Sequence, residues 1–200
     1  MHTAIIAALA YLIGSLPFAV IASRIFGLAD PRSYGSGNPG ATNVLRSGNK
    51  KAAIVTLLGD ALKGSVVVLL AKAFADRGNL SNFDIAIAGL FVFLGHVFSI
   101  FLRFRGGKGV ATAAGVLFGM HPGVGVLTLC VWLLSAAITR YSSAAALAAA
   151  VAAPALTAWL QAEPHWTGAV CAMSAILIWR HKANIQKLLS GQESRIGKKT

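Results

Sequence analysis

The sequence predicts an all-α integral membrane protein that forms a single polytopic membrane domain over residues 1–200. Hydrophobic residues make up 56% of the chain and charged residues only 12%, and the mean hydropathy is +0.69. Apolar runs of about 20 residues, long enough to cross a bilayer as a helix, recur as far as residue 181. These runs lack the two-residue alternation of a transmembrane barrel, so the fold class is helical.

The apolar runs predict about seven transmembrane helices. The first contains Gly-Ser-Leu-Pro at residues 14–17, which predicts a kink. The fourth is short, and a Met-His-Pro-Gly turn at residues 120–123 joins it to the fifth. These two therefore either cross the bilayer separately or form a re-entrant pair, and the number of spans depends on which. The predicted spans are residues 4–26, 53–74, 84–102, 110–120, 123–139, 143–161 and 165–181.

The basic residues predict the orientation in the membrane. Fifteen of the 18 lysines and arginines lie in the loop after the first span, in residues 103–108, at Arg140, or from Arg180 onward. Because basic loops stay in the cytoplasm, we expect the N-terminus outside, the C-terminus inside, and residues 182–200 as a cytoplasmic tail. This topology explains the net charge of +12 without nucleic acid as a partner. The expected environment is the lipid bilayer.

One glycine-rich stretch stands out between the third and fourth spans. Gly106, Gly107 and Gly109 surround Lys108 and favour a turn over a helix or a strand. Glycine lets the backbone approach a ligand, and the helix that follows offers the positive end of its dipole. A phosphate site fits this pattern, and a basic turn against anionic lipid head groups is the alternative. The stretch does not match a Walker A loop.

The first predicted cytoplasmic loop, residues 32–46, is rich in Gly, Ser, Asn, Pro and Thr. This composition predicts a structured turn with many small hydrogen-bond donors and no helix, and a flexible linker is the alternative. Arg46 carries a guanidinium fork suited to phosphate, and the topology places it on the same side as Lys108. The two segments together predict a polar cup between the spans.

The last predicted span ends at His181, and Asn184 follows three residues later. On a continuing helix these two side chains share one face and can reach a hydroxyl or phosphoryl oxygen in the cup. A purely structural histidine is the alternative, and the neighbouring Arg180 and Lys182 can equally act as topology anchors.

Two further polar positions fall inside spans. Asp60 and Lys63 are three residues apart in the second span, where an unpaired charge is costly. We expect them to pair and brace helix packing, a proton or substrate role being the alternative. His96, in the third span, is expected to hold the loop that contains Lys108.

The cytoplasmic side offers few groups for other chemistry. Only Asp30 and Glu193 supply carboxylates there, too few for a metal cluster, and no Gly-x-Ser-x-Gly nucleophile motif is present. We therefore expect no metal and no cofactor. An enzyme built on this cup would act on an activated substrate with a good leaving group, mainly through positioning and charge stabilisation.

Three segments resemble the motifs of bacterial acyl-phosphate:glycerol-3-phosphate acyltransferases, the PlsY family. They are residues 35–46 (GSGNPGATNVLR), residues 95–96 with 104–112 (GH and FRGGKGVAT), and residues 180–185 (RHKANI) continuing to Glu193. Residues 59–64 (GDALKG) and 140–142 (RYS) also fit. The segments occur in the family's order and span nearly the whole chain.

The resemblance implies a seven-helix enzyme of the bacterial inner membrane with a cytoplasmic active site. It would transfer a fatty acyl group from acyl phosphate to the 1-hydroxyl of glycerol 3-phosphate, giving lysophosphatidic acid, and depend on an upstream enzyme that makes acyl phosphate. The resemblance implies that substrate phosphate is bound by Ser36, Arg46, Gly106, Gly107, Lys108 and Gly109. It implies that catalysis depends on Ser36, Arg46, Lys108, His181 and Asn184. Glu193 is expected to be structural.

Because the cup has no obvious protein base, we expect a substrate phosphate oxygen to take the hydroxyl proton, with His181 as the competing base. Other functions fit less well. A transporter of a phosphorylated metabolite needs polar residues through to the outer side, and a CDP-alcohol phosphotransferase needs clustered aspartates. The residues alone do not distinguish acyl phosphate from a thioester donor.

Overall fold

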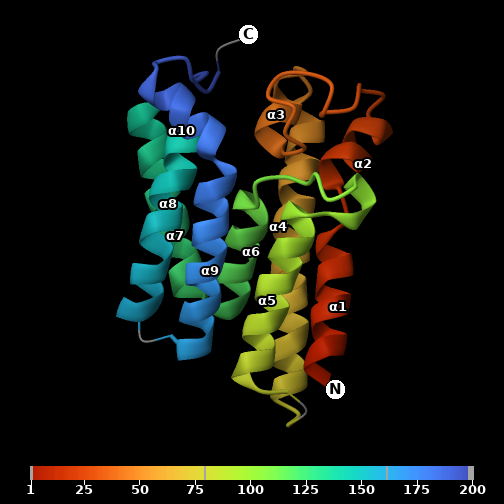
Figure 1. Ribbon diagram of the computed structural model, residues 1–200, viewed down its shortest axis with the longest axis vertical. Helices are drawn as coiled ribbons and strands as arrows, with labels where there is room; N and C mark the ends of the chain where they lie inside the picture. Colours follow the sequence, from red (N-terminus) through yellow and green to blue (C-terminus); the bar gives the residue numbers. More distant parts are fainter. Residues whose placement is uncertain (1, 79, 161, 198–200) are drawn as a thin grey trace.

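The computed structural model describes residues 2–78, 80–160 and 162–197, and over these ranges the chain is helical. Most helices run side by side between two ends of the molecule, with the N-terminus at one end and the C-terminus at the other (Figure 1). The elements are α1 (His2–Gly14), α2 (Phe18–Ile25), α3 (Ala41–Leu45), α4 (Lys50–Ala75), α5 (Asn82–Val97), a 3-10 turn (Ile100–Leu102), α6 (Val110–Met120), α7 (Pro122–Thr139), α8 (Ser142–Trp159), α9 (Pro164–Arg180) and α10 (Lys182–Leu189).

Within the described residues, five helical segments are long and apolar enough to cross a membrane. Two other apolar helices are shorter, α6 with 11 residues and α9 with 17. At 1.5 Å per residue, α6 spans about 17 Å, roughly half of a bilayer core. The count of seven spans and the side of the membrane that each end faces therefore stay predictions. The five segments are His2–Ile25, Lys50–Ala75, Asn82–Leu102, Pro122–Thr139 and Ser142–Trp159.

The helices match the predicted spans closely. The kink predicted at residues 14–17 is a real break, since α1 ends at Gly14 and α2 begins after Pro17. Residue 161, at the predicted end of the sixth span, and residues 198–200 of the predicted tail lie outside the described residues.

One local prediction was wrong. Residues 41–45 of the loop after the first predicted span form the short helix α3, where no helix was expected. The turn-forming residues stop at Gly40, which precedes the helix in an extended conformation, and Ala, Val and Leu then return. The rest of the loop is a structured turn, as predicted.

Helix α5 lies at the centre of the packing, because it contacts α1, α4, α6 and α9. Small residues let α4 and α6 approach closely. A methyl group on Gly115 would lie 1.9 Å from the backbone oxygen of Ala61. Such contacts between small residues are the usual basis of helix association in membranes. The loop that leaves the end of α5 therefore starts from a rigid base.

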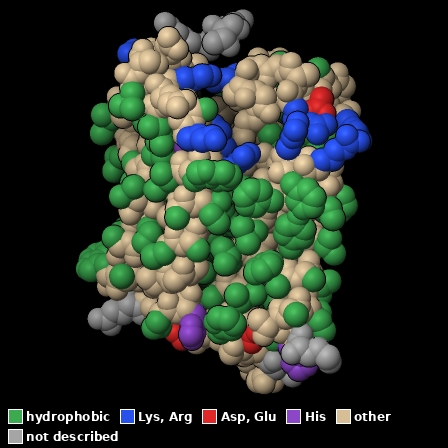
Figure 2. Space-filling model, viewed as in Figure 1, with side chains coloured by type: hydrophobic (Ala, Val, Ile, Leu, Met, Phe, Trp, Pro, Cys, Tyr) green, Lys and Arg blue, Asp and Glu red, His purple; other side chains and the backbone are tan. Residues whose placement is uncertain are grey.

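The surface divides into an apolar middle and two polar ends (Figure 2). Lys and Arg side chains gather at the end that carries the C-terminus, near α2, α3 and α10 (Figures 1 and 2). At the opposite end, Asp84 accepts a hydrogen bond from Thr3, and Glu163 accepts one from Asn82. This separation follows the charge pattern of the sequence.

Candidate active site

The glycine-rich loop, residues 103–109, folds back onto the end of α5. The amide of Gly106 donates to the Val97 carbonyl at 3.1 Å, and the amide of Gly107 donates to the His96 carbonyl at 3.1 Å. Arg103 and Phe104 adopt left-handed conformations with φ of 52° and 61°, which turn the chain back. The loop is thus fixed by backbone contacts before any ligand binds.

Lys108 projects from this loop toward the C-terminal part of the chain. Its ammonium donates a hydrogen bond to Asn184 Oδ1. Asn184 Nδ2 in turn donates to Glu193 Oε1 at 2.8 Å, and Ser143 Oγ donates to the same oxygen at 2.9 Å. Side chains from the loop, α10, the tail and α8 therefore meet in one continuous chain of polar contacts.

The surroundings of Lys108 are strongly cationic. Burial lowers the pKa of its ammonium from 10.5 to about 8. The nearby charges of Arg180, Arg46 and Lys187 contribute to this fall in pKa, and the carboxylate of Glu193 opposes it. A half-buried lysine beside two guanidinium groups and one carboxylate is arranged to bind an anion.

The loop of residues 32–46 is organised by Asn43. Its Nδ2 donates to the carbonyls of Pro31 at 2.6 Å and Tyr34 at 3.2 Å, and its Oδ1 accepts from the amide of Ser36 at 2.9 Å. This buried amide fixes the turn that presents Ser36, whose side chain is exposed. Ser36 is therefore placed by its backbone.

Arg46 follows α3 and reaches across to the tail, where its guanidinium donates to Ser194 Oγ. The loop also contacts α8, since the hydroxyls of Thr42 and Ser142 are 3.3 Å apart. Loop, tail and α8 thus close around the same end of the bundle as the glycine-rich loop. Arg46 therefore lies at the same end of the bundle as Lys108, near enough for its charge to lower the pKa of that lysine.

The end of α9 contributes two groups in different ways. Arg180 Nη2 donates to the carbonyl of Gly106 at 3.0 Å and so clamps the glycine-rich loop. His181 is 2% exposed, and its Nδ1 lies 2.8 Å from the carbonyl of Leu177. Because a carbonyl only accepts, Nδ1 carries the proton and Nε2 keeps its lone pair.

His181 and Asn184 do not lie on one continuing helix, so the condition for a shared face is not met. Helix α9 ends at Arg180 and α10 begins at Lys182, with His181 between them. The imidazole bonds back into α9, while the Asn184 side chain reaches Lys108. The two groups come from opposite sides of a helix break.

Two sets of predicted site residues are each joined by direct contacts, whereas Ser36 and His181 bond elsewhere, to Asn43 and Leu177. Lys108, Asn184 and Glu193 are directly linked, and Arg46 joins them through the adjacent Ser194. Gly109 precedes α6 with φ of 89° and contacts Phe93. The second group, Asp60, Lys63 and His96, forms a buried cluster below the glycine-rich loop.

Sequence reasoning missed Asn43, Ser143 and Ser194 as members of the site, and left open whether Arg180 is only a topology anchor. The signal for Ser143 was its position three residues after the basic residue Arg140. Asn43 and Ser194 carried no signal beyond membership of the resembling segments or their flank. In the described part of the chain, no three His, Cys, Asp or Glu side chains are grouped to hold a metal ion.

The sequence model of the family "Glycerol-3-phosphate acyltransferase" matches residues 4–191. A glycerol-3-phosphate acyltransferase of Paraburkholderia phymatum is 59% identical over 199 residues, covering 100% of this chain and 95% of that protein. One of Ralstonia pickettii is 58% identical over 197 residues, covering 98% and 95%.

Two solved structures share the fold. The crystal structure of PlsY (YgiH), an integral membrane glycerol 3-phosphate acyltransferase, in its glycerol 3-phosphate form matches with a TM-score of 0.91 and 34% identity, covering 98% of this chain and 96% of that one. Its lysophosphatidic acid form matches with a TM-score of 0.89 and 33% identity over the same shares. Sequence and fold agree across almost the entire length, and the chain therefore belongs to the PlsY family of glycerol-3-phosphate acyltransferases.

Proposed function

We propose that this protein transfers a fatty acyl group from an acyl phosphate to the 1-hydroxyl of glycerol 3-phosphate, yielding lysophosphatidic acid and phosphate. This would be the first step of bacterial phospholipid synthesis. The family and the two ligand forms of its solved member support the acceptor and the product. The observation that supports the proposal most is the cationic group of Lys108, Arg46 and Arg180 beside a single carboxylate.

The chemistry follows from an activated donor and an anion site. The glycerol hydroxyl oxygen attacks the carbonyl carbon of the mixed anhydride and forms the ester bond. The bond from that carbon to the phosphate oxygen then breaks, and its electron pair leaves with phosphate. Lys108 and Arg46 bind the phosphates and stabilise the charge that develops on the leaving group.

The proton of the attacking hydroxyl passes to a phosphate oxygen of the substrate. Glu193 is poorly suited as a base, because its Oε1 already accepts hydrogen bonds from Asn184 and Ser143. His181 is the competing base, since its Nε2 has a free lone pair. We expect a His181→Asn variant to keep most of its turnover. A fall in kcat of about 10⁴-fold at unchanged KM would assign the base to His181.

The donor is tested with purified enzyme in detergent or liposomes. Palmitoyl phosphate and palmitoyl-coenzyme A are supplied separately with labelled glycerol 3-phosphate, and lysophosphatidic acid and phosphate are measured. We expect product from palmitoyl phosphate alone, and a Lys108→Ala variant that folds but gives none. Product from the thioester alone would refute the donor, and product from neither would refute the function. Accumulation of label inside liposomes without product would identify a transporter.

We also propose that the enzyme resides in the bacterial inner membrane with its site facing the cytoplasm, where an upstream enzyme supplies acyl phosphate. The gathering of Lys and Arg at the end that carries the site supports this orientation (Figure 2). In a variant without native cysteines, Ser190→Cys should react with a membrane-impermeant maleimide in inverted vesicles only. Labelling of intact spheroplasts would reverse the orientation.

A further inference from the structure

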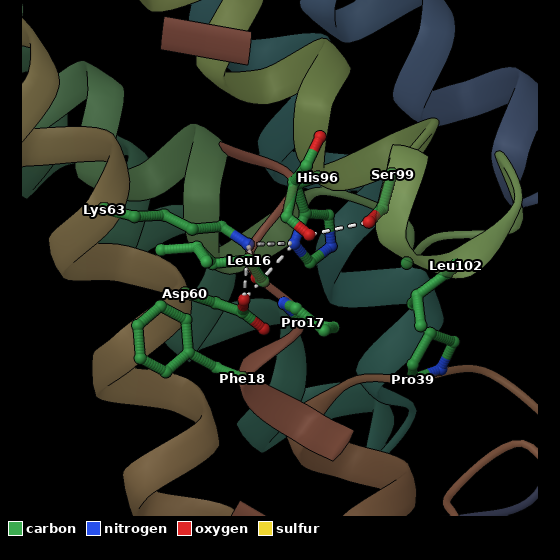
Figure 3. A pocket seen from close by; sticks show the side chains of 11 residues that line it. Leu16, Pro17, Phe18, Pro39, Asp60, Lys63, His96, Ser99 and Leu102 are labelled. Carbon is green, nitrogen blue, oxygen red and sulfur yellow. Dashed lines mark hydrogen bonds and ion pairs between the residues drawn. The ribbon is translucent and has the colours of Figure 1, made fainter. Parts of the chain in front are cut away.

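A cluster of three ionisable side chains lies inside the bundle, outside the site described above. Asp60 and Lys63 of α4 are 3% and 5% exposed, and His96 of α5 is 8% exposed. They line a small cavity together with Leu16, Pro17 and Gly107 (Figure 3). Burying charged groups in a membrane protein is costly, so their arrangement calls for a function.

Lys63 makes three polar contacts, as many as an ammonium can donate. Its Nζ lies 2.8 Å from Asp60 Oδ1, 2.9 Å from the carbonyl oxygen of Leu16, and 3.0 Å from Nδ1 of His96 (Figure 3). The first two atoms can only accept. His96 Nδ1 also lies 3.3 Å from Asp60 Oδ1. Because Nδ1 is closer to Lys63, whose ammonium can only donate, we infer that Nδ1 accepts from Lys63 and that the ring proton is on Nε2. The cluster fixes both the position of the imidazole and its tautomer.

The other edge of this imidazole lies against the glycine-rich loop. A methyl group on Gly107 would be 2.2 Å from His96 Nε2 and 2.8 Å from Cε1. The backbone also joins here, since the Gly107 amide donates to the His96 carbonyl. Gly107 thus packs against one edge of the His96 ring, and Lys63 contacts the opposite edge. Lys108 directly follows Gly107 in the chain.

We propose that Asp60, Lys63 and His96 are positioning residues that set the place of the Lys108 ammonium from within the bundle. Asp60 and the Leu16 carbonyl orient Lys63, Lys63 orients His96, and the imidazole is the surface against which Gly107 rests. The break between α1 and α2 takes part, because it exposes the Leu16 carbonyl. This inference rests on the proposed binding of substrate phosphate by Lys108.

The direct contact between His96 and Gly107 allows a test by rescue. We expect Gly107→Ala to lower kcat/KM by about 10²-fold, the effect of moving a substrate-binding group by about 1 Å. His96→Ala should raise KM for glycerol 3-phosphate about 10-fold. The double variant should recover most of the way from the Gly107→Ala level to that of His96→Ala, because removing the ring leaves the Pro39 carbonyl oxygen, at 3.2 Å, as the tightest contact of the methyl group. The melting temperatures of the four proteins should show the same recovery.

Gly106 provides the matched control. A methyl group there would lie 2.0 Å from the backbone oxygen of His96, which truncating the side chain does not remove. His96→Ala should therefore rescue Gly107→Ala and leave Gly106→Ala unrescued. Equal rescue of both, or of neither, in activity and in melting temperature would overturn the inference. So would a His96→Ala variant that melts earlier but keeps its KM, because that result describes a purely structural residue.

A second measurement follows the tautomer without relying on activity. In enzyme labelled with ¹⁵N-histidine, the His96 signals, identified by their loss in His96→Ala, should show a protonated Nε2 and a bare Nδ1. Replacing the pair by Asp60→Leu with Lys63→Met avoids an unpaired buried charge and should raise KM as His96→Ala does. A proton on Nδ1 in the wild type, or an unchanged KM in this variant, would refute the arrangement. Failure of the wild type to make lysophosphatidic acid would instead refute the proposed function.

Discussion

Raising the pH through 8 should remove the positive charge of Lys108 and weaken the phosphate site. Burial lowers the pKa of this ammonium from 10.5 to about 8. The group is therefore charged below that pH and neutral above it, so activity that needs the charge is lost as the pH rises. One pH unit above the pKa leaves about a tenth of the enzyme protonated, and kcat/KM for glycerol 3-phosphate should fall about 10-fold by pH 9.

The assay measures lysophosphatidic acid between pH 6.5 and 10 with acyl phosphate held far below its KM, and the rate without enzyme is subtracted. The parameter kcat/KM is used because it reports the pKa of the free enzyme. The substrate does not contribute to this decline, since a phosphate monoester with a second pKa of about 6 is already a dianion at these pH values.

Lys108→Arg supplies the matched control. A guanidinium with a pKa above about 12 stays charged over the whole range, so this variant should show lower but pH-independent activity above pH 7.5. A wild-type profile that stays level to pH 10 would refute the reasoning, because Lys108 would then be either unperturbed or unnecessary. A decline of the same shape in Lys108→Arg would assign the titration to another group.

Three further predictions concern the contacts around this lysine and the helices below it. In Glu193→Gln the decline should begin at a lower pH, because the carboxylate raises the pKa of Lys108; an unshifted profile would contradict that coupling. Asn184→Leu should reduce kcat/KM by about 10- to 150-fold, the equivalent of one hydrogen bond to a charged group at about 1.5–3 kcal/mol; near-normal kinetics would show that the bond is dispensable. Gly115→Val should destabilise the protein by about 1–3 kcal/mol, because its side chain meets the Ala61 carbonyl, and an unchanged melting temperature would contradict the tight α4–α6 packing.

The positions of the helices could largely be predicted from the sequence. Apolar runs placed α4, α6, α7 and α8 to within a few residues, because the bilayer requires such runs wherever a helix crosses it. Proline and glycine located the break between α1 and α2. The short helix α3 was missed because its five residues follow a stretch of turn formers and carry no periodic signal of their own.

For the site, the sequence predicted candidate residues and not the contacts between them. Position in a loop and charge type selected Lys108 and Arg46, and the three-residue spacing from His181 selected Asn184. Yet Asn184 joins Lys108 across a separation of 76 residues, and Arg46 joins Ser194 across 148. Contacts at such distances depend on how the helices pack, which no local pattern records. The organising role of Asn43 is hidden for the same reason. In the sequence this asparagine follows several turn-forming residues and looks like one of them.

By itself, the sequence determined a helical membrane protein with its basic residues at one end, because hydrophobicity and charge act through local composition. It also determined that the glycine-rich loop could not be a helix. Only the tertiary structure decided that this loop rests on the His96 imidazole, which a buried ion pair holds in place. It also decided that Lys108 is linked through Asn184 to the Glu193 carboxylate, which accepts two hydrogen bonds. Those decisions belong to packing, since each brings together groups that the chain keeps far apart.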